Sequence, residues 1–339
     1  MAKVGIKDIA AKAGVSIATV SHALRNPGRV STKTREKVLA AADEIGYAPN
    51  SLARSLRTAR SGSIVAIIPD VADSHNSSII KAIEKVAHSR GYSVLLGDTQ
   101  GSEQREREFA AMARSGQADG IILMSHRLPF NVQDGPLRIE DLPPLVNGCE
   151  YAGYDEFPVV GIDDTQAAID ATNHLIDFGH REIAVITGDI ESTSTQNRMT
   201  GFKAAMADAG LTIDDSFIIY DEYTLEGGER ATSTLLMRKT RPTAVLCFSD
   251  EIALGCMFVL RQHGFDVPND ISVIGFDNIP FAKYAAPPLT TIAQPGSDIG
   301  ATCATLLLDL IDGKKPDENR HVVPHELLIR ESTMRLPGA

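Results

Sequence analysis

Residues 6–25 read IKDIAAKAGVSIATVSHALR, and this stretch decides how the N-terminus folds. Its apolar residues recur at helical spacing on both sides of Gly14, which interrupts the pattern. Ser16 follows directly and can cap a second helix. The residues predicted to face inward are Ile6, Ile9, Ala10, Ala13, Val20, Ala23 and Leu24. Two short helices joined by a tight turn that contains glycine are typical of the helix-turn-helix, whose second helix enters the major groove of DNA.

The charge of the N-terminal segment distinguishes a DNA-binding helix-turn-helix from any other small helical hairpin, which would show the same periodicity. Residues 1–60 hold 11 Lys and Arg against four acids, a net charge of +7. The whole chain carries −11, so the rest of it carries −18. A basic segment can also be a solvated face or a flexible tail, but its periodic apolar residues favour a folded domain. A basic head can neutralise phosphates, while an acidic body is repelled by DNA.

Length and composition exclude several classes. A chain of 339 residues is expected to form two or three domains. It has no apolar run of 18 residues and no signal-peptide pattern at its start, so we expect a soluble, cytoplasmic protein without a membrane partner. The four cysteines are scattered and no histidines cluster, so neither disulfides nor a metal site are expected. No cofactor motif occurs either.

The head continues with a third helix and a linker. TKTREKVLAAADEIG, residues 32–46, can be capped by Ser31 or Thr32 and stops at Gly46. Residues 50–57, NSLARSLR, form a helical pattern that is too short to be stable alone, since about 12–15 residues are usually needed. Residues 58–63 read as a linker. We therefore predict a DNA-binding domain at 1–48, a hinge helix and linker at 49–62, and a body at 63–339.

The body alternates strands and helices. Apolar runs predict strands at 64–68, 94–96, 120–124, 145–149, 159–162, 183–187, 217–220, 244–248 and 272–276. Amphipathic helices are predicted at 77–89, 103–115, 165–178, 198–209, 227–238 and 251–263. Buried strands separated by helices indicate parallel sheets covered on both faces, and this number of strands favours two doubly wound α/β lobes.

Polar residues at strand ends are the candidate ligand contacts, because ligands of such sheets bind beyond the carboxyl ends of strands. They are Asp70, Asp98, Ser125, Glu150, Asp163, Asp250 and Asp277. Each alone fits a helix cap or a loop residue at least as well. Together, facing one cleft, they predict a polar ligand site.

Enzymatic function is the main rival, because doubly wound folds host many chemistries. The chain lacks a G-x-G-x-x-G loop after a strand, a Walker loop and a G-x-S-x-G elbow. HELLI at 325–329 is not a zinc motif and reads as a strand alternation. A transport binding protein would need an export signal and would have no use for residues 1–60. We therefore predict a regulator and not an enzyme.

The sequence resembles the LacI/GalR family of bacterial transcriptional regulators over nearly its whole length. The matching stretches are residues 6–24, VSTKTREKVLAAADEIGYAPN (30–50), ARSL (53–56), GFKAAM (201–206), SDEIALG (249–255), VPNDISVIGFDN (267–278) and PPLTTIAQP (287–295). Within the family, IIPDVAD, SHRLPF and CFSD are most similar to the cytidine-repressor branch. The resemblance implies a two-lobed periplasmic-binding-protein-like body behind the helix-turn-helix.

The resemblance also implies which residues read DNA. The base-reading positions fall on Ser16, Ile17, Ala18, Thr19 and His22. Ile17 and Ala18 can offer only apolar contact, for example to thymine methyl groups. The family usually has Arg where this chain has His22, so the half-site is expected to differ there; alternatively His22 contacts a phosphate.

The segment ARSL corresponds to the family's hinge helix, which enters the minor groove. Its implied DNA contacts are Asn50, Ala53, Arg54 and Leu56. Leu56 is the expected wedge, since paired apolar side chains can unstack the central base step and bend the duplex. The alternative is that Leu52 and Leu56 only fasten the linker to the body.

For the body, the resemblance implies that Arg198 and Asp277 hold a small-molecule effector. An ionised Asp277 suits paired hydroxyls because a carboxylate accepts only and every hydroxyl can donate. Weaker candidates around the same cleft are His75, Asn76, Ser125, Glu150, Phe248, Asp250 and Gln294. A helix-capping role is equally open for Asp250. His75, Asn76 and Cys149 depart from the residues that are common in relatives.

These expectations combine into one mechanism. A homodimer presents two heads to a palindromic operator on double-stranded DNA. An effector, a nucleoside or alternatively a sugar, moves one lobe against the other. Because the hinge helix is only marginally stable, this motion orders or melts it and changes operator affinity.

Overall fold

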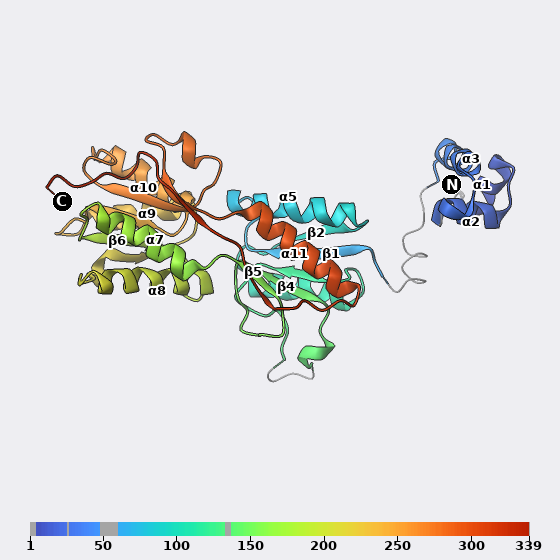
Figure 1. The fold of residues 1–339 in the computed structure, drawn as a ribbon, viewed down its shortest axis with the longest axis horizontal. Coiled ribbons are helices and arrows are strands. Elements are labelled where there is room, and N and C mark those ends of the chain that lie inside the picture. Colours follow the sequence, from blue (N-terminus) through green and yellow to red (C-terminus); the bar gives the residue numbers. More distant parts are fainter. Residues whose placement is uncertain (1–4, 26, 48–59, 133–136, 339) are drawn as a thin grey trace. The chain divides into compact units, whose positions relative to one another are not determined.

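The computed structural model describes residues 5–25, 27–47, 60–132 and 137–338 (Figure 1). The chain divides into two compact units, Met1–Ser61 and Gly62–Ala339. The first unit is the head and the second is the body, and each is described by itself. The predicted DNA contacts Asn50, Ala53, Arg54 and Leu56 lie outside the described residues.

The head is a bundle of three helices, α1 (Ile6–Ala13), α2 (Ile17–Arg25) and α3 (Thr32–Glu44). Gly14 ends α1 in the left-handed region at φ 59°, a conformation that a residue without Cβ adopts at no steric cost. The Ser16 hydroxyl accepts from the Thr19 N–H at 3.0 Å and caps α2, as predicted. Ser31, rather than Thr32, caps α3. The buried core is Ile9, Ala10, Ala13, Val20, Ala23, Val38, Ala41 and Ala42. The helix-turn-helix prediction is confirmed.

The body holds two six-stranded sheets, and each belongs to one lobe. The first lobe has the strand order β11-β5-β4-β3-β1-β2 and the second β12-β10-β9-β8-β6-β7. All recorded strand pairs are parallel except β10 with β12. The strands are β1 (Ser63–Ile68), β2 (Ser93–Asp98), β3 (Ile121–Leu123), β4 (Leu145–Gly148), β5 (Val159–Gly161), β6 (Ile183–Thr187), β7 (Ile218–Tyr220), β8 (Ala244–Cys247), β9 (Ser272–Asp277), β10 (Thr290–Ala293), β11 (Arg320–Val322) and β12 (Glu326–Leu328). The two-lobed α/β prediction is confirmed.

Helices cover both sheets. The first lobe carries α5 (Ser74–Ser89), α6 (Glu103–Arg114) and α11 (Gly296–Ile311), and α5 packs along α11 (Figure 1). The second lobe carries α7 (Asp164–Asp177), α8 (Thr193–Asp208), α9 (Leu225–Leu236) and α10 (Asp250–Gln262). The chain passes between the lobes after β5, after β10 and after β11. The lobes therefore meet at a seam crossed by three segments.

The C-terminal strap, residues 329–336, fastens onto the second lobe. The Val273 N–H donates to the Ser332 carbonyl at 2.8 Å, and the Leu336 N–H donates to the Phe178 carbonyl at 2.8 Å. Two buried histidines hold the strap from the lobe side. His174 Nε2 lies 2.9 Å from the Thr333 hydroxyl, and His180 Nε2 lies 3.1 Å from the Met334 carbonyl.

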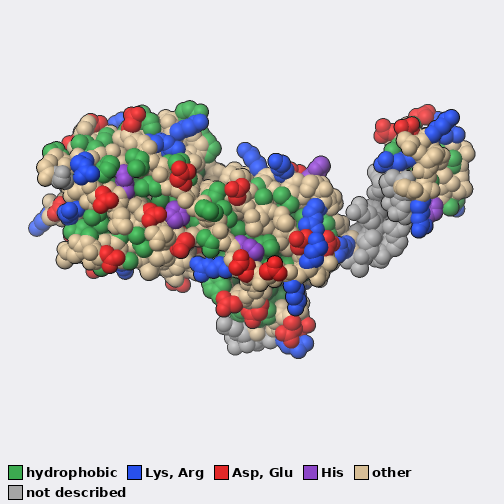
Figure 2. Space-filling view, viewed as in Figure 1, with side chains coloured by type: hydrophobic (Ala, Val, Ile, Leu, Met, Phe, Trp, Pro, Cys, Tyr) green, Lys and Arg blue, Asp and Glu red, His purple; other side chains and the backbone are tan. Residues whose placement is uncertain are grey.

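Within the described residues, no helix is both long and apolar enough to cross a membrane. Acidic side chains are spread over both lobes on the face that Figure 2 displays. This agrees with the negative charge of the sequence beyond the head.

Candidate functional site: the start of α2 and the seam between the lobes

The start of α2 presents the side chains that were predicted to read DNA. Ser16, Ile17 and Ala18 are exposed, and Thr19 is half-buried on the same turn. Ile17 leaves 49% of its surface open, although Val20 and Ala23 on the opposite face are buried. An apolar side chain left open at a helix start is free to meet a base edge in a groove. His22 lies one turn further on and is half-buried.

Arg198 is the centre of the seam site. It lies on α8 with 6% of its surface exposed. Its Nε donates to Asp164 Oδ1 at 2.7 Å and its Nη1 to the Phe248 carbonyl at 2.6 Å. The guanidinium carbon also lies 3.8 Å from the centre of the Phe276 ring. Burial opposes the charge, but Asp164 and other neighbours outweigh it and raise the pKa of Arg198. The guanidinium is therefore a fixed positive charge.

Asp277 ends β9, and its carboxylate and the Arg198 guanidinium act on each other electrostatically. Its φ of 117° lies in the left-handed region, which L-residues rarely occupy. Its Oδ1 accepts from Gln294 Nε2 at 2.6 Å. Burial raises the pKa of Asp277 to about 7, although Arg198 acts in the opposite direction. The side chain therefore titrates near neutral pH.

Asp250 has a different role from either prediction. It is completely buried, and its carboxylate accepts from the Ile279 N–H at 2.8 Å and from the Thr291 hydroxyl at 2.6 Å. The helix cap of α10 is Ser249, which accepts from the Ile252 N–H, so the capping hypothesis for Asp250 is wrong. Both carboxylate oxygens are occupied. Asp250 thus supports the turn that carries Asp277.

Glu150, which was predicted as a ligand contact, has several hydrogen-bond partners in the other lobe. Its carboxylate accepts hydrogen bonds from the first turn of α8 across the seam, namely from the hydroxyl of Ser192 (2.7 Å), the N–H and hydroxyl of Thr193 (2.9 and 2.5 Å) and the N–H and hydroxyl of Ser194 (3.3 and 2.6 Å). A carboxylate suits a helix start because both the free N–H groups and the helix dipole favour negative charge there. Glu150 therefore joins the lobes.

Three more predicted contacts form hydrogen bonds within the protein. Asn76 Nδ2 donates to the Asp70 carbonyl at 2.9 Å, and the Ser125 hydroxyl donates to Glu106 Oε1 at 2.9 Å. The Phe248 ring is fully buried, so this residue contributes only its carbonyl to Arg198. Their polar groups stabilise loops around the seam.

His75 is placed at the seam together with Cys149. Its Nε2 lies 3.9 Å from Cys149 Sγ. Burial lowers the pKa of His75 to about 4, so the imidazole is neutral near neutral pH. Two of the three residues that depart from the family pattern, His75 and Cys149, thus lie side by side.

Four seam residues were not predicted as ligand contacts: Asp73, Asp164, Tyr223 and Glu251. The Tyr223 hydroxyl lies 2.7 Å from the Thr195 hydroxyl on α8. The Ser74 N–H donates to Glu251 Oε1 at 3.4 Å, which joins α5 of the first lobe to α10 of the second. Tyr223 and Asp164 could have been predicted from the sequence as ligand contacts, since each follows a predicted strand within a few residues.

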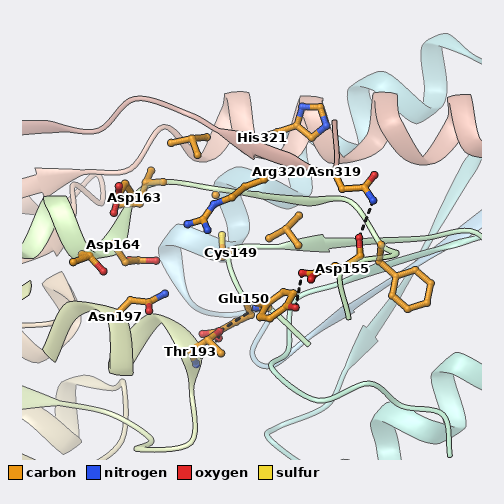
Figure 3. A pocket seen from close by; sticks show the side chains of 17 residues that line it. Cys149, Glu150, Asp155, Asp163, Asp164, Thr193, Asn197, Asn319, Arg320 and His321 are labelled. Atoms are coloured by element: carbon orange, nitrogen blue, oxygen red, sulfur yellow. Dashed lines mark hydrogen bonds between the residues drawn. The ribbon is translucent and has the colours of Figure 1, made fainter. Parts of the chain in front are cut away.

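A cavity of about 660 Å³ opens beside this cluster (Figure 3). Its walls come from both lobes and from two of the crossing segments. The polar lining includes Glu150, Tyr151, Asp155, Asp163, Asp164, Thr193, Asn197, Asn319, Arg320 and His321. Its volume lies in the range of pockets that hold small ligands, which often form between domains. Cys149 and Asp164 line it and also contact His75 and Arg198, so the cavity adjoins the seam site.

No group of three or more metal-binding side chains occurs among the described residues.

Known proteins match both units. Residues 5–50 match the family described as bacterial regulatory proteins, lacI family, and residues 172–333 match the periplasmic binding protein-like domain. The chain is 41% identical to the HTH-type transcriptional repressor CytR of Escherichia coli K12, over 98% of this chain and 97% of that protein. It is 36% identical to the HTH-type transcriptional regulator DegA of Bacillus subtilis, over 98% and 99% of the two chains.

Solved structures agree. The Lac repressor dimer bound to operator and the anti-inducer ONPF aligns with a TM-score of 0.83 at 27% identity, covering 98% of this chain and 99% of that one. The complex of the transcriptional regulator CelR with cellobiose aligns with a TM-score of 0.72 at 29% identity, covering 97% and 99%. By near full-length identity, the chain belongs to the LacI family of bacterial regulatory proteins.

Proposed function

We propose that this protein is a transcriptional repressor whose operator affinity is controlled by a nucleoside bound at the seam between the lobes. The observation that carries the proposal is the buried Arg198, whose partner Asp164 lines the cavity between the lobes and whose charge acts on Asp277, in a chain that also has an exposed α2 start. The resemblance to the cytidine-repressor branch supports a nucleoside. We propose no catalytic role and a cytoplasmic location.

The DNA-bound species is proposed to be a homodimer on a palindromic operator, in line with the Lac repressor dimer that aligns over the full length. Residues 1–48 would read the half-sites through Ser16, Ile17, Ala18, Thr19 and His22. Residues 49–62 would form the hinge, with Asn50, Ala53, Arg54 and Leu56 at the minor groove.

A sugar effector is the second candidate. Similar solved structures include CelR with cellobiose and an Enterococcus faecium LacI family regulator with bound ribose, the latter at a TM-score of 0.71 and 26% identity over 81% of this chain and 100% of that one. Sugars and nucleosides share hydroxyl groups, which Asp277 and Gln294 suit as hydrogen-bond partners.

Thermal unfolding of the full chain against nucleosides and sugars tests the proposal. A ligand that binds only the folded state raises stability by about 2.7 kcal/mol at a hundredfold excess over its Kd. We expect a shift with cytidine, uridine or adenosine, and none with Asp277→Ala at the same concentration. A shift with sugars alone would support the second candidate. A panel without any shift would contradict both.

A further inference from the structure

Glu150 joins the loop after β4 in the first lobe to the start of α8 in the second lobe, and we name this contact the interlobe clamp. Its Oε1 accepts from the hydroxyls of Ser192 and Ser194. Its Oε2 accepts from the N–H and hydroxyl of Thr193 and from the Ser194 N–H. The Tyr151 N–H donates to Thr193 Oγ1 at 3.0 Å. Glu150 and Thr193 also line the cavity, and Figure 3 draws the contact between them. The interlobe clamp thus consists of these five residues.

The first turn of α8 does not depend on Glu150 to form. Ser192 precedes the helix and caps it, accepting from the Thr195 N–H at 3.3 Å. In the same lobe, α7, α9 and α10 likewise have their caps in the residue directly before them. A helix start still favours an added carboxylate, because its free N–H groups and its dipole attract negative charge. Since this carboxylate comes from the other lobe, its effect is to fix α8 relative to the first lobe.

Helix α8 carries part of the interlobe clamp and the central residue of the seam site on one face. Ser194 and Arg198 are four residues apart, a spacing that places both side chains on the same side of a helix. Both side chains are buried. Arg198 donates to Asp164 in the first turn of α7 and to the Phe248 carbonyl after β8. The interlobe clamp therefore fixes the first lobe relative to the helix that carries the Arg198 guanidinium.

The interlobe clamp is stronger than the hydrogen bond that the Ser74 N–H donates across the seam to Glu251 Oε1. That contact is a single hydrogen bond of 3.4 Å, whereas three of the five hydrogen bonds that Glu150 accepts measure 2.5–2.7 Å. Hydrogen bonds to an ionised acceptor are roughly twice as strong as those between neutral groups. Because hinge motion between domains is absorbed by a few residues, noncovalent contacts of this kind decide which lobe arrangement is populated.

We propose that Glu150 is a positioning residue that favours the lobe arrangement seen here and thereby sets how strongly the protein responds to its effector. The inference rests on the proposed function and deepens it by naming the residue that regulates the seam site. An effector shifts two arrangements only by its different affinities for them. The population that Glu150 favours therefore enters both the DNA affinity and the effector affinity of the free protein.

The variant Glu150→Gln tests this role, because it keeps the size of the side chain and removes the charge that attracts the five donors. Three quantities are measured on the full chain. Anisotropy gives the affinity for a DNA duplex that the wild type selects from a random library. Calorimetry gives the affinity for cytidine and for ribose, and urea denaturation gives the unfolding midpoint. We expect the DNA affinity to change by at least about fivefold, the lower end of usual coupling.

The sign of the second change is fixed by the first. If the ligand weakens DNA binding in the wild type, the ligand affinity of Glu150→Gln should change in the direction opposite to its DNA affinity. If the ligand strengthens DNA binding, both affinities should change in the same direction. A residue that only stabilises the fold would lower the unfolding midpoint without producing this relation.

A variant on the other lobe shows whether Glu150 acts through α8. Ser194→Ala removes one hydroxyl donor to Glu150 Oε1, and it should change both affinities in the same directions as Glu150→Gln but by less. The double variant should differ little from Glu150→Gln, because both changes break one contact and such effects are not additive. Asp214→Asn is the matched control. Its exposed carboxylate accepts from the Ser216 N–H within the second lobe, so both affinities should stay as in the wild type.

Unchanged affinities in Glu150→Gln would overturn the inference, and so would additive effects of the two variants. Affinity changes that lack the expected relation of signs would do so as well. If Glu150→Gln does not fold, Ser194→Ala decides by the same relation. If neither cytidine nor ribose binds the wild type, the proposed effectors fail. The DNA affinity of Glu150→Gln at an unchanged unfolding midpoint then decides the inference separately, because it requires no effector.

Discussion

At the scale of single residues, the buried pair of Arg198 and Asp164 makes the sharpest prediction. Asp164→Ala should lower the free energy of unfolding by about 3–5 kcal/mol, because it leaves a buried guanidinium without its counter-charge. Urea denaturation followed by circular dichroism measures the change. Glu103→Ala breaks the exposed ion pair with Arg107 and should cost less than about 1 kcal/mol. A similar small cost for both variants would show that the buried pair does not stabilise the fold.

The same scale shows how far sequence reasoning reaches at the site. Arg198 and Asp277 were predicted from the family resemblance and, for Asp277, from the end of a strand, and both lie at the seam. Glu150 and Asp250 were predicted as ligand contacts, and in the structure their carboxylates accept hydrogen bonds from the protein itself. Their partners come from segments tens of residues away, which a sequence pattern does not reveal.

At the scale of elements, the two buried histidines make the C-terminal strap sensitive to acid. Burial lowers the pKa of His174 and of His180 from the ordinary value of 6.5. Below about pH 6.5 the unfolded chain therefore binds protons that the folded chain does not bind. The free energy of unfolding keeps its full value above this pH and falls as the pH drops. Each histidine contributes up to about 1.4 kcal/mol per pH unit.

Urea midpoints between pH 5 and 7.5 measure this loss. His180→Gln retains a donor for the Met334 carbonyl but cannot titrate, so its stability should depend less on pH. His88→Gln removes an exposed histidine from α5 and should leave the pH dependence as in the wild type. An unchanged slope in His180→Gln would mean that the strap does not sense acid.

Elements themselves were predicted well where the pattern was long. All nine predicted strands and all six predicted body helices are present, with ends that differ by a few residues. Helix α11 and strands β10 and β11 were not assigned, whereas the strand alternation predicted at 325–329 contains β12. In α11 small and apolar residues follow one another without a polar face for most of its length, because it packs on α5 and on the sheet. Strand β11 reads RHV and therefore lacks the apolar run that revealed the equally short β3, β5 and β7.

At the scale of the whole molecule, the charge separation predicts that salt weakens operator binding and leaves the binding of an uncharged effector almost unchanged. The head carries +7 and the remainder −18. Operator affinity should fall by about a thousandfold or more between 50 and 200 mM salt, since each phosphate contact releases counterions. Affinity for an uncharged effector should change little. Fluorescence anisotropy with labelled operator measures operator affinity, and calorimetry measures effector affinity. An equal salt dependence of the two affinities would contradict the assignment of DNA binding to the basic head and effector binding to the acidic body.

The final prediction concerns the link between the two units. If the effector changes operator affinity by a given factor, the operator must change effector affinity by the same factor, because both describe one coupling free energy. We expect a factor of about 5–150, equivalent to about 1–3 kcal/mol. Leu56→Ala should weaken operator binding while effector affinity of the free protein stays unchanged. Asp277→Ala should abolish the effector response and leave operator binding intact. Anisotropy and calorimetry under one salt condition measure the two affinity changes in the wild type. If these changes are unequal, a second process, such as dissociation of the dimer, carries part of the coupling.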